Sequence, residues 1–206
     1  MKTIGAVLFP EFEMLDLYGP LEMYAMQRDA FEIRTVAQDS GPVTSSGGPE
    51  TVAMDSFGDD VVYDLLLVPG GRGARDQLRN PVMLDWLGQV AGRTSLVTTV
   101  CTGSMLLAAT GFLTDRRATT NKLAFDQVAA LFPDVDWQPR ARWVKDGTVV
   151  TSSGVSAGMD MTLAVIGEIM GASAADDAAR WAEYTRVKDP TDDPFALVDE
   201  EETADG

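Results

Sequence analysis

The sequence predicts an α/β fold in which helices cover both faces of a central, mostly parallel sheet. Apolar runs at residues 4–9, 64–68 and 96–100 have the composition of buried strands, and a further strand is predicted at 31–37. Helical stretches separate most of these runs, and strands that alternate with helices form parallel sheets. Ligands bind at the carboxyl ends of the strands in such sheets, so residues that directly follow a predicted strand are the first candidates for a functional site.

The first half of the chain contains the following predicted elements, in order: a strand at 4–9, a turn at 10–13, a helix that starts near Asp16, a strand at 31–37, a loop or hairpin at 40–49 and a short strand at 51–54. Asp16 precedes an apolar helical stretch, which makes it a candidate for the helix N-cap. Glycine, serine and proline are concentrated in residues 40–49, as is typical of loops.

The second half contains these predicted elements, in order: a strand at 64–68, a helix at 80–92, a strand at 96–100, a helix at 105–109, a strand at 117–120, a helix at 122–131, a hairpin formed by 143–145 and 148–152, a turn at 153–157, and helices at 159–170 and 174–184. Gly70 and Gly71 follow the strand at 64–68, in a turn whose backbone N–H groups can face a ligand. Residues 188–206 are rich in proline, acidic residues and threonine, so we predict a disordered acidic tail after a single domain at 1–187.

The composition limits which partners, cellular setting and metal sites we expect for the protein. The formal net charge of −16 disfavours binding to nucleic-acid phosphates, and fits either a high-salt cytoplasm or an ordinary acidic protein. The apolar run at the N-terminus is too short to span a membrane and lacks the layout of a signal peptide. A single cysteine cannot form an intrachain disulfide, which favours a reduced, cytoplasmic setting. One cysteine without any histidine also argues against a structural zinc site.

Cys101 is the only cysteine, and it stands where the strand at 96–100 ends and a helical stretch begins. A tight turn there leaves the thiol near a helix N-terminus, where unpaired N–H groups and the helix dipole favour the thiolate. Two roles are open: an activated nucleophile on a strand–turn–helix elbow, or a small apolar side chain in the core. Because the chain has no histidine, a carboxylate is the natural proton partner of a catalytic thiol. Asp16 is one candidate, with helix capping as its alternative role.

Four motifs together resemble the ThiJ/PfpI superfamily and, within it, the isonitrile hydratases. They are LFPEFEMLDLYGPLEMY, DLLLVPGG followed after one residue by glycine, SLVTTVCTGSMLLAATGFLTDRRATT, and VVTSSGVSAGMDMTLAVIGEIMG. The resemblance extends from the N-terminus to about Tyr184. It implies a flavodoxin-like three-layer sandwich with a nucleophile elbow, and a homodimer.

The resemblance also implies roles for individual residues. Cys101 is expected to be the elbow nucleophile in a strained backbone conformation, with Asp16 next to the thiol. Thr102 is expected to tune the site and, with Gly71, to offer backbone N–H groups to the pocket. Thr102 replaces the histidine that follows the cysteine in the peptidase-like branch, so peptidase activity is not expected. Asn121 stands where the hydratase branch commonly has histidine, and an amide forms hydrogen bonds but does not titrate. The expected set is Cys101, Asp16 and Thr102 for catalysis, and Gly70, Gly71 and Asn121 for substrate binding.

The expected activity is the hydration of an isonitrile, a small-molecule substrate, to an N-substituted formamide. In this mechanism Asp16 supplies a proton to the terminal carbon, the Cys101 thiolate attacks that carbon, and Asp16 then activates water. The reaction requires neither a metal nor an organic cofactor. Three alternatives remain: a cysteine-based oxidative-stress sensor without turnover, a glyoxalase-like activity on 2-oxoaldehydes, and the sensor half of a transcription regulator. The last would need a helix-turn-helix domain, which the short acidic tail is not expected to supply.

Overall fold

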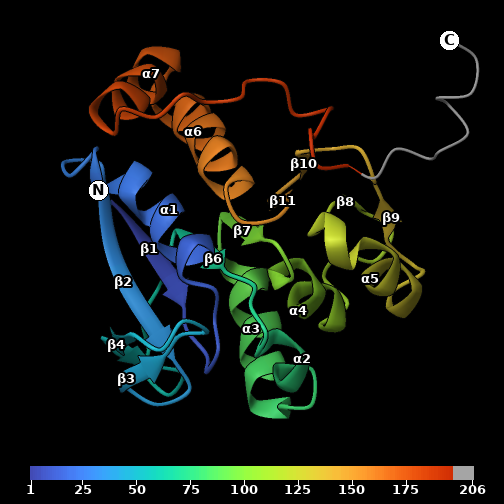
Figure 1. Cartoon of the computed structure of the whole chain (residues 1–206). Helices are drawn as coiled ribbons and strands as arrows, with labels where there is room; N and C mark the ends of the chain where they lie inside the picture. Colours follow the sequence, from blue (N-terminus) through green and yellow to red (C-terminus); the bar gives the residue numbers. More distant parts are fainter. Residues whose placement is uncertain (197–206) are drawn as a thin grey trace, which may run out of the picture.

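The computed structural model describes residues 1–196 and confirms the predicted α/β class (Figure 1). A seven-stranded sheet has the strand order β10-β11-β7-β6-β1-β2-β5, and every neighbouring pair is parallel except β10 with β11. Its strands are β1 (Lys2–Val7), β2 (Phe31–Ala37), β5 (Asp55–Ser56), β6 (Leu65–Val68), β7 (Leu96–Val100), β10 (Trp143–Asp146) and β11 (Val149–Ser152).

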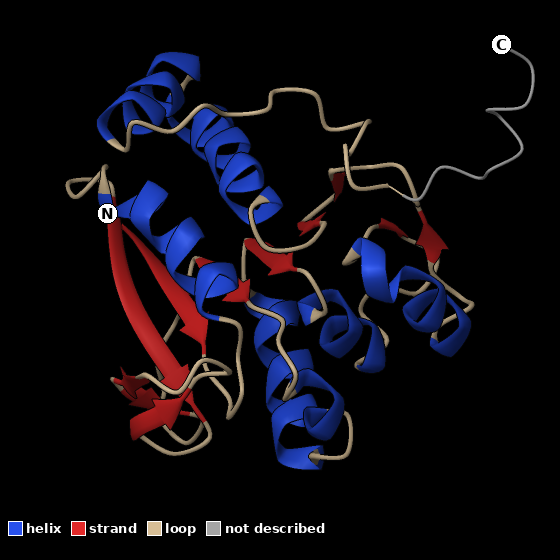
Figure 2. Ribbon diagram, viewed as in Figure 1, coloured by secondary structure: helices blue, strands red, loops and turns tan. Residues whose placement is uncertain are grey.

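Helices form a layer on each side of this sheet (Figures 1 and 2). One layer contains α1 (Met14–Ala25), α6 (Ala157–Met170) and α7 (Ala172–Trp181), and the other contains α2 (Ala74–Gln77), α3 (Pro81–Arg93) and α4 (Gly103–Ala109). Because both faces are covered, the central strands read as continuous apolar runs, and all four residues of β6 are buried.

Smaller elements lie outside the central sheet. A hairpin of β3 (Gly41–Thr44) and β4 (Glu50–Ala53) occupies most of the segment predicted as a loop or hairpin. Beyond the other edge, β8 (Arg117–Ala118) pairs with β9 (Asp136–Trp137), and the 3₁₀ turn η1 (Lys122–Ala124) leads into α5 (Phe125–Leu131). The predicted helix at 122–131 is therefore split into two elements. The sequence analysis missed α2, β5 and β9 because elements of two to four residues carry too little periodicity to detect.

The first part of the predicted disordered tail is ordered against the domain, contrary to the prediction. Residues 188–196 lie against the domain: the Arg142 backbone N–H donates to Pro190 O at 2.8 Å, and Asp193 is only 3% exposed. The buried guanidinium of Arg142 lies 3.5 Å from an Asp193 carboxylate oxygen, so an ion pair holds a segment whose composition suggested disorder. The rest of the predicted tail, residues 197–206, lies outside the described residues.

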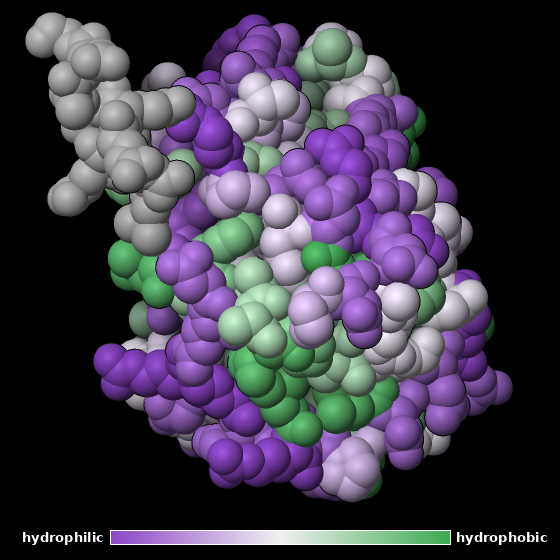
Figure 3. Space-filling view, turned by 90° about the vertical axis from the view of Figure 1, so that its right-hand side faces the viewer, coloured by the Kyte–Doolittle hydropathy of each residue, from purple (hydrophilic) through white to green (hydrophobic). Residues whose placement is uncertain are grey.

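One face of the molecule is mostly hydrophilic. Figure 3, which faces the side of the molecule where α5 lies, shows mostly hydrophilic residues, with an area of hydrophobic residues toward the lower edge. Within residues 1–196, no helix is both long and apolar enough to cross a membrane.

Candidate active site

Cys101 occupies the turn between β7 and α4, as predicted for a strand–turn–helix elbow. Its backbone has φ = 58°, in the left-handed region that costs a non-glycine residue about 1–2 kcal/mol. Hydrogen bonds hold this conformation from both sides: the Cys101 N–H donates to Ser152 O at 3.2 Å, and the Cys101 carbonyl accepts from the Thr120 hydroxyl at 3.1 Å. The strained backbone is therefore fixed by the end of β11 and by the segment after β8.

The start of α4 is packed directly against the end of β6. A Cβ atom on Gly103 would lie 2.2 Å from the carbonyl oxygen of Val68, so only glycine fits without a backbone shift. This close approach brings the turn at Gly70 and Gly71 next to the cysteine elbow. In the sequence, the only sign of the close approach between α4 and β6 is the glycine at position 103, two residues after Cys101.

Asp16 lies in the first turn of α1, but it does not cap the helix. The N-cap position is Glu13, no side-chain hydrogen bond caps the helix, and the Asp16 side chain is fully buried. The Gly70 N–H donates to Asp16 Oδ2 at 3.0 Å. The other oxygen, Oδ1, is buried and makes no hydrogen bond of ordinary geometry within residues 1–196. The capping alternative is thus wrong, and the carboxyl group faces the elbow instead.

Burial controls the protonation of this carboxyl group. It raises the pKa of Asp16 from its ordinary value of 3.8 to about 7, and the charge of Glu13 acts in the same direction. The Gly70 N–H opposes this effect most strongly, and the nearby Cys101 thiol and Val155 backbone oppose it further. Asp16 therefore exchanges a proton near neutral pH, as a general acid or base requires.

The resting thiol of Cys101 differs from the prediction. Burial and the neighbouring Asp16 carboxylate raise its pKa to about 12, although the Thr102 and Asn121 groups partly oppose them. The side chain is only 8% exposed, and α4 has seven residues, so water and the helix dipole stabilise the thiolate too little. The expectation of a thiolate held by the helix field is therefore wrong, and the thiol needs a base to become a nucleophile.

The glycine turn after β6 lies against two of the three predicted catalytic residues, Thr102 and Asp16. A Cβ atom on Gly70 would lie 2.6 Å from the Thr102 nitrogen and 2.9 Å from Asp16 Oδ2. The next residue, Gly71, has φ = 135° and donates its N–H to the Thr102 hydroxyl at 3.1 Å. The Gly71 N–H is therefore already engaged, and Thr102 connects the two turns instead of leaving both N–H groups to a ligand.

A pocket of about 290 Å³ opens beside the thiol. Four of the predicted site residues line it: Cys101, Thr102, Gly71 and Asn121. Asp16 and Gly70 lie behind this lining, next to the elbow. Sequence reasoning did not identify the remaining lining residues, which are Glu13, Arg72, Arg75, Leu123, Ala124 and Val155. Of these, Val155 lies in the predicted small-residue turn at 153–157 and has φ = 46°, which is strained for valine. The small residues of the SGVSA sequence were the only sequence signal for this turn.

Asn121 fixes the segment that closes the pocket. Its Oδ1 accepts the Ala124 N–H at 3.1 Å and so caps η1. On its other side, a Cβ atom on Gly154 would lie 2.4 Å from Asn121 Nδ2. The amide therefore acts as a positioned hydrogen-bonding group between two loops, and it lowers the pKa of Cys101 slightly.

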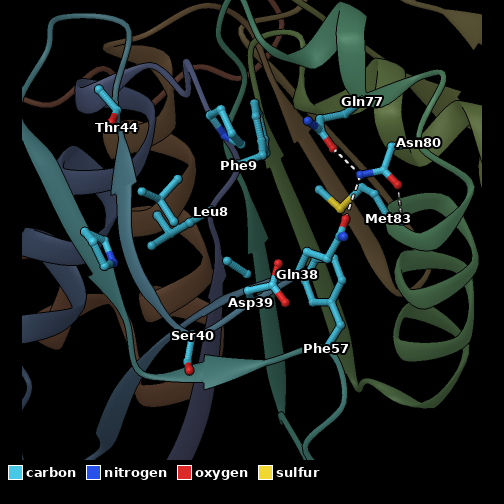
Figure 4. A pocket seen from close by; sticks show the side chains of 14 residues that line it. Leu8, Phe9, Gln38, Asp39, Ser40, Thr44, Phe57, Gln77, Asn80 and Met83 are labelled. Atoms are coloured by element: carbon cyan, nitrogen blue, oxygen red, sulfur yellow. Dashed lines mark hydrogen bonds between the residues drawn. The ribbon is translucent and has the colours of Figure 1, made fainter.

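Another pocket, of about 420 Å³ and separate from the cysteine site, lies at the carboxyl ends of β1 and β2 (Figure 4). It includes Gln38, Gln77 and Asn80, and Asn80 Nδ2 donates to the oxygens of both glutamines at 2.9 Å. None of the predicted site residues lines this pocket, so the reactive groups converge elsewhere. Among residues 1–196, no three histidine, cysteine, aspartate or glutamate side chains gather closely enough to hold a metal ion.

These features define a class of protein: a doubly wound α/β domain with a cysteine on a strained elbow and a buried carboxyl group beside it. Residues 2–168 match the DJ-1/PfpI family, and the chain belongs to that family. An isonitrile hydratase from Pseudomonas putida is 36% identical over 203 residues, which cover 96% of this chain and 87% of that protein. The resemblance to the ThiJ/PfpI superfamily is thereby confirmed.

Two further comparisons show the breadth of the family. A Parkinson disease protein 7 homolog from Danio rerio is 34% identical over 114 residues, which cover 55% of this chain and 59% of that protein. The crystal structure of a ThiJ/PfpI family protein from Pseudomonas syringae is 29% identical and has a TM-score of 0.83, covering 97% of this chain and 80% of that one.

Proposed function

We propose that the protein hydrates an isonitrile to an N-substituted formamide, with Cys101 as nucleophile and Asp16 as proton carrier. The observation that carries this proposal is the buried Asp16 carboxyl group, which has a pKa of about 7 and lies next to a thiol that is protonated at rest. Above pH 7 this pair holds one proton, and an isonitrile carbon needs one proton and one nucleophile. The similarity to an isonitrile hydratase supports the same assignment.

In the first step, the Asp16 carboxylate accepts the thiol proton as the sulfur attacks the terminal carbon of the isonitrile. Asp16 then delivers that proton to the same carbon, so the thiol adds across one atom and yields an enzyme-bound thioimidate. The strained elbow holds the sulfur at the pocket wall. The buried Asp16 carboxylate beside it takes the role of base that a histidine would fill, since the chain has no histidine.

In the second step, the ionised Asp16 removes a proton from water, whose oxygen attacks the thioimidate carbon. Asp16 passes that water proton to the nitrogen, the carbon–sulfur bond breaks as the new hydroxyl group becomes the formyl oxygen, and Asp16 carries the second water proton from that hydroxyl group to the sulfur. The products are the N-substituted formamide and the free enzyme, so the balance is one isonitrile and one water per formamide. Every proton moves between Asp16, Cys101, water and the substrate.

The decisive experiment incubates the purified protein with cyclohexyl isocyanide and measures N-cyclohexylformamide by mass spectrometry. We expect formamide to form well above the rate without protein, and to contain one ¹⁸O atom when the reaction runs in labelled water. A rate equal to the background with alkyl and aryl isonitriles alike would contradict the proposed function. The pH profile adds a second check: kcat/KM should rise about tenfold per pH unit below pH 7 and level off above it, because the reaction needs the pair with one proton.

Replacing Asp16 by asparagine should lower activity and raise stability. Turnover should fall by about 10²- to 10⁴-fold, because the amide cannot carry a proton. The folded pKa lies above the unfolded value, so the wild type loses stability as pH rises from about 4 to 7, by about 4 kcal/mol in total. Urea unfolding should therefore show Asp16→Asn as more stable than wild type at pH 8, with a difference that vanishes toward pH 4.

A matched control for this variant is Glu22→Gln, which removes an exposed carboxylate from the same helix. It should leave both turnover and the pH dependence of unfolding close to wild type. An Asp16→Asn variant with wild-type turnover would exclude the proton-carrier role even if the stability change is found.

The alternative of a peroxide sensor has less support from the site. Oxidation by peroxide requires an accessible thiolate, whereas the Cys101 thiol is 8% exposed and has its pKa raised to about 12. Intact-mass measurement after mild peroxide should therefore find Cys101 mostly unoxidised under conditions where isonitrile turnover is rapid.

A further inference from the structure

A second cavity continues from the cysteine pocket. It has a volume of about 340 Å³ and shares Asn121, Leu123 and Val155 with the pocket beside Cys101. The two pockets therefore lie side by side and share this part of their walls, and the reactive sulfur is in the lining of the first. A substrate whose reactive carbon reaches Cys101 can place its remaining atoms in the neighbouring cavity or in solvent.

The wall of the second cavity is largely apolar. Leu123 and Phe195 line it although they are 93% and 69% exposed, respectively, so both present large hydrophobic side chains to the cavity and to solvent. Lys122 also lines it, but its ammonium group is turned inward and donates to Thr119 Oγ1 at 2.8 Å and to Ala141 O at 2.6 Å. The one cation of the wall is thus already satisfied by the protein, and the cavity offers mainly hydrophobic surface.

Phe195 reaches this cavity because the segment 188–196 is anchored. Asp193 Oδ1 accepts the Phe195 N–H at 2.9 Å, and the same oxygen lies 3.5 Å from the Arg142 guanidinium. Arg142 is buried and pairs on its other side with Asp160 of α6 at 2.6 Å. A chain of polar contacts therefore connects the core of the domain to the backbone of Phe195, and it fixes where the ring lies.

We propose that this second cavity binds the nitrogen substituent of the substrate, and that Phe195 and Leu123 make bulky apolar substituents the preferred class. The inference rests on the proposed function for its substrate, but the cavity itself is independent of the reaction. The segment 188–196 is then part of the substrate site and is not a tail. Truncating either side chain opens the apolar wall to water, so it weakens the binding of a large substituent and leaves a methyl group nearly unaffected.

The first experiment compares cyclohexyl isocyanide with methyl isocyanide. Phe195→Ala and Leu123→Ala should each lower kcat/KM for the cyclohexyl substrate by about 5- to 10-fold, mainly through KM, and change the methyl substrate by less than about twofold. Trp181→Ala is the matched control, since Trp181 is an aromatic residue that is 78% exposed and lines neither pocket. Equal losses with both substrates, or no loss in either variant, would overturn the inference.

The second experiment requires no catalysis. Titration of ¹⁵N-labelled protein with N-cyclohexylformamide should shift the amide signals of Leu123, Gly154 and Val155, with an affinity about tenfold higher than that of N-methylformamide. Phe195→Ala should remove most of that difference. If this binding is found but no isonitrile is hydrated, the proposed function fails and the substituent site stands. If N-cyclohexylformamide does not bind, or binds no better than N-methylformamide, the substituent site is refuted even if hydration is observed.

Discussion

Replacement of Cys101 by alanine should lower isonitrile turnover on the order of 10⁴-fold, because it removes the thiol that attacks the isonitrile carbon in the proposed first step. The loss should appear in kcat, since the thiol forms a bond that exists only along the reaction path. Steady-state assays of formamide production measure it, and intact-mass analysis of the wild type during turnover should detect an adduct that the variant lacks. Unaltered turnover in Cys101→Ala would refute covalent catalysis.

The same position offers a control for backbone strain. Cys101 has φ = 58°, which alanine tolerates no better than cysteine, whereas glycine adopts it without penalty. Cys101→Gly should therefore be more stable than Cys101→Ala by about 1 kcal/mol, while both are inactive. Thermal unfolding of the two variants separates the strain at the elbow from the chemistry of the sulfur.

Replacement of Asp160 by alanine should lower the free energy of unfolding by about 3–5 kcal/mol. Arg142 is only 3% exposed. Its nearest charged partner is Asp160, whose Oδ2 lies 2.6 Å from Arg142 Nη2 and 2.8 Å from Arg142 Nε. Without Asp160, the one carboxylate left near Arg142 within residues 1–196 is the more distant Asp193, so the guanidinium remains a poorly compensated buried charge. The melting temperature should fall by about 10 °C, as differential scanning calorimetry would measure.

A second ion pair of the chain supplies the control. Lys145 and Glu168 also form a salt bridge, but their side chains are 45% and 50% exposed, so water already stabilises both charges. Glu168→Ala should therefore cost less than about 1 kcal/mol. A similar loss in both variants, or a loss below about 1 kcal/mol in Asp160→Ala, would contradict the role assigned to the buried pair.

Much of the fold could be predicted from local sequence because its signals are local. Continuous apolar runs indicate strands that are covered on both faces, and the run at 96–100 coincides with β7. Asn80 and Pro81 predicted the start of α3, and the Asn80 side chain does cap that helix by accepting the Met83 N–H at 3.3 Å. The two-residue strands β5 and β9 were missed because they exist only through pairing with other segments, β2 and β8.

The candidate site was predicted in part. The position of Cys101 at the end of β7 followed from the order of strand, turn and helix, and the motifs that resemble the family pointed to Asp16. From sequence alone, helix capping remained an alternative role for Asp16, because an aspartate at the start of a helix has the same local pattern whether it caps the helix or serves a catalytic site. Only the packing of α1 against the β6 turn turns this carboxyl group toward the elbow, where the Gly70 N–H holds it.

By itself, the sequence determined the α/β class, the order of its main elements and the location of the single thiol, since strand and helix formation depend on neighbouring residues. Tertiary structure alone decided the protonation of Cys101 and Asp16, because burial by segments far apart in the chain sets both pKa values. It also decided that residues 188–196 join the domain. Their acidic composition favours disorder, but the Asp193 carboxylate pairs with the guanidinium of Arg142, which is buried elsewhere in the fold.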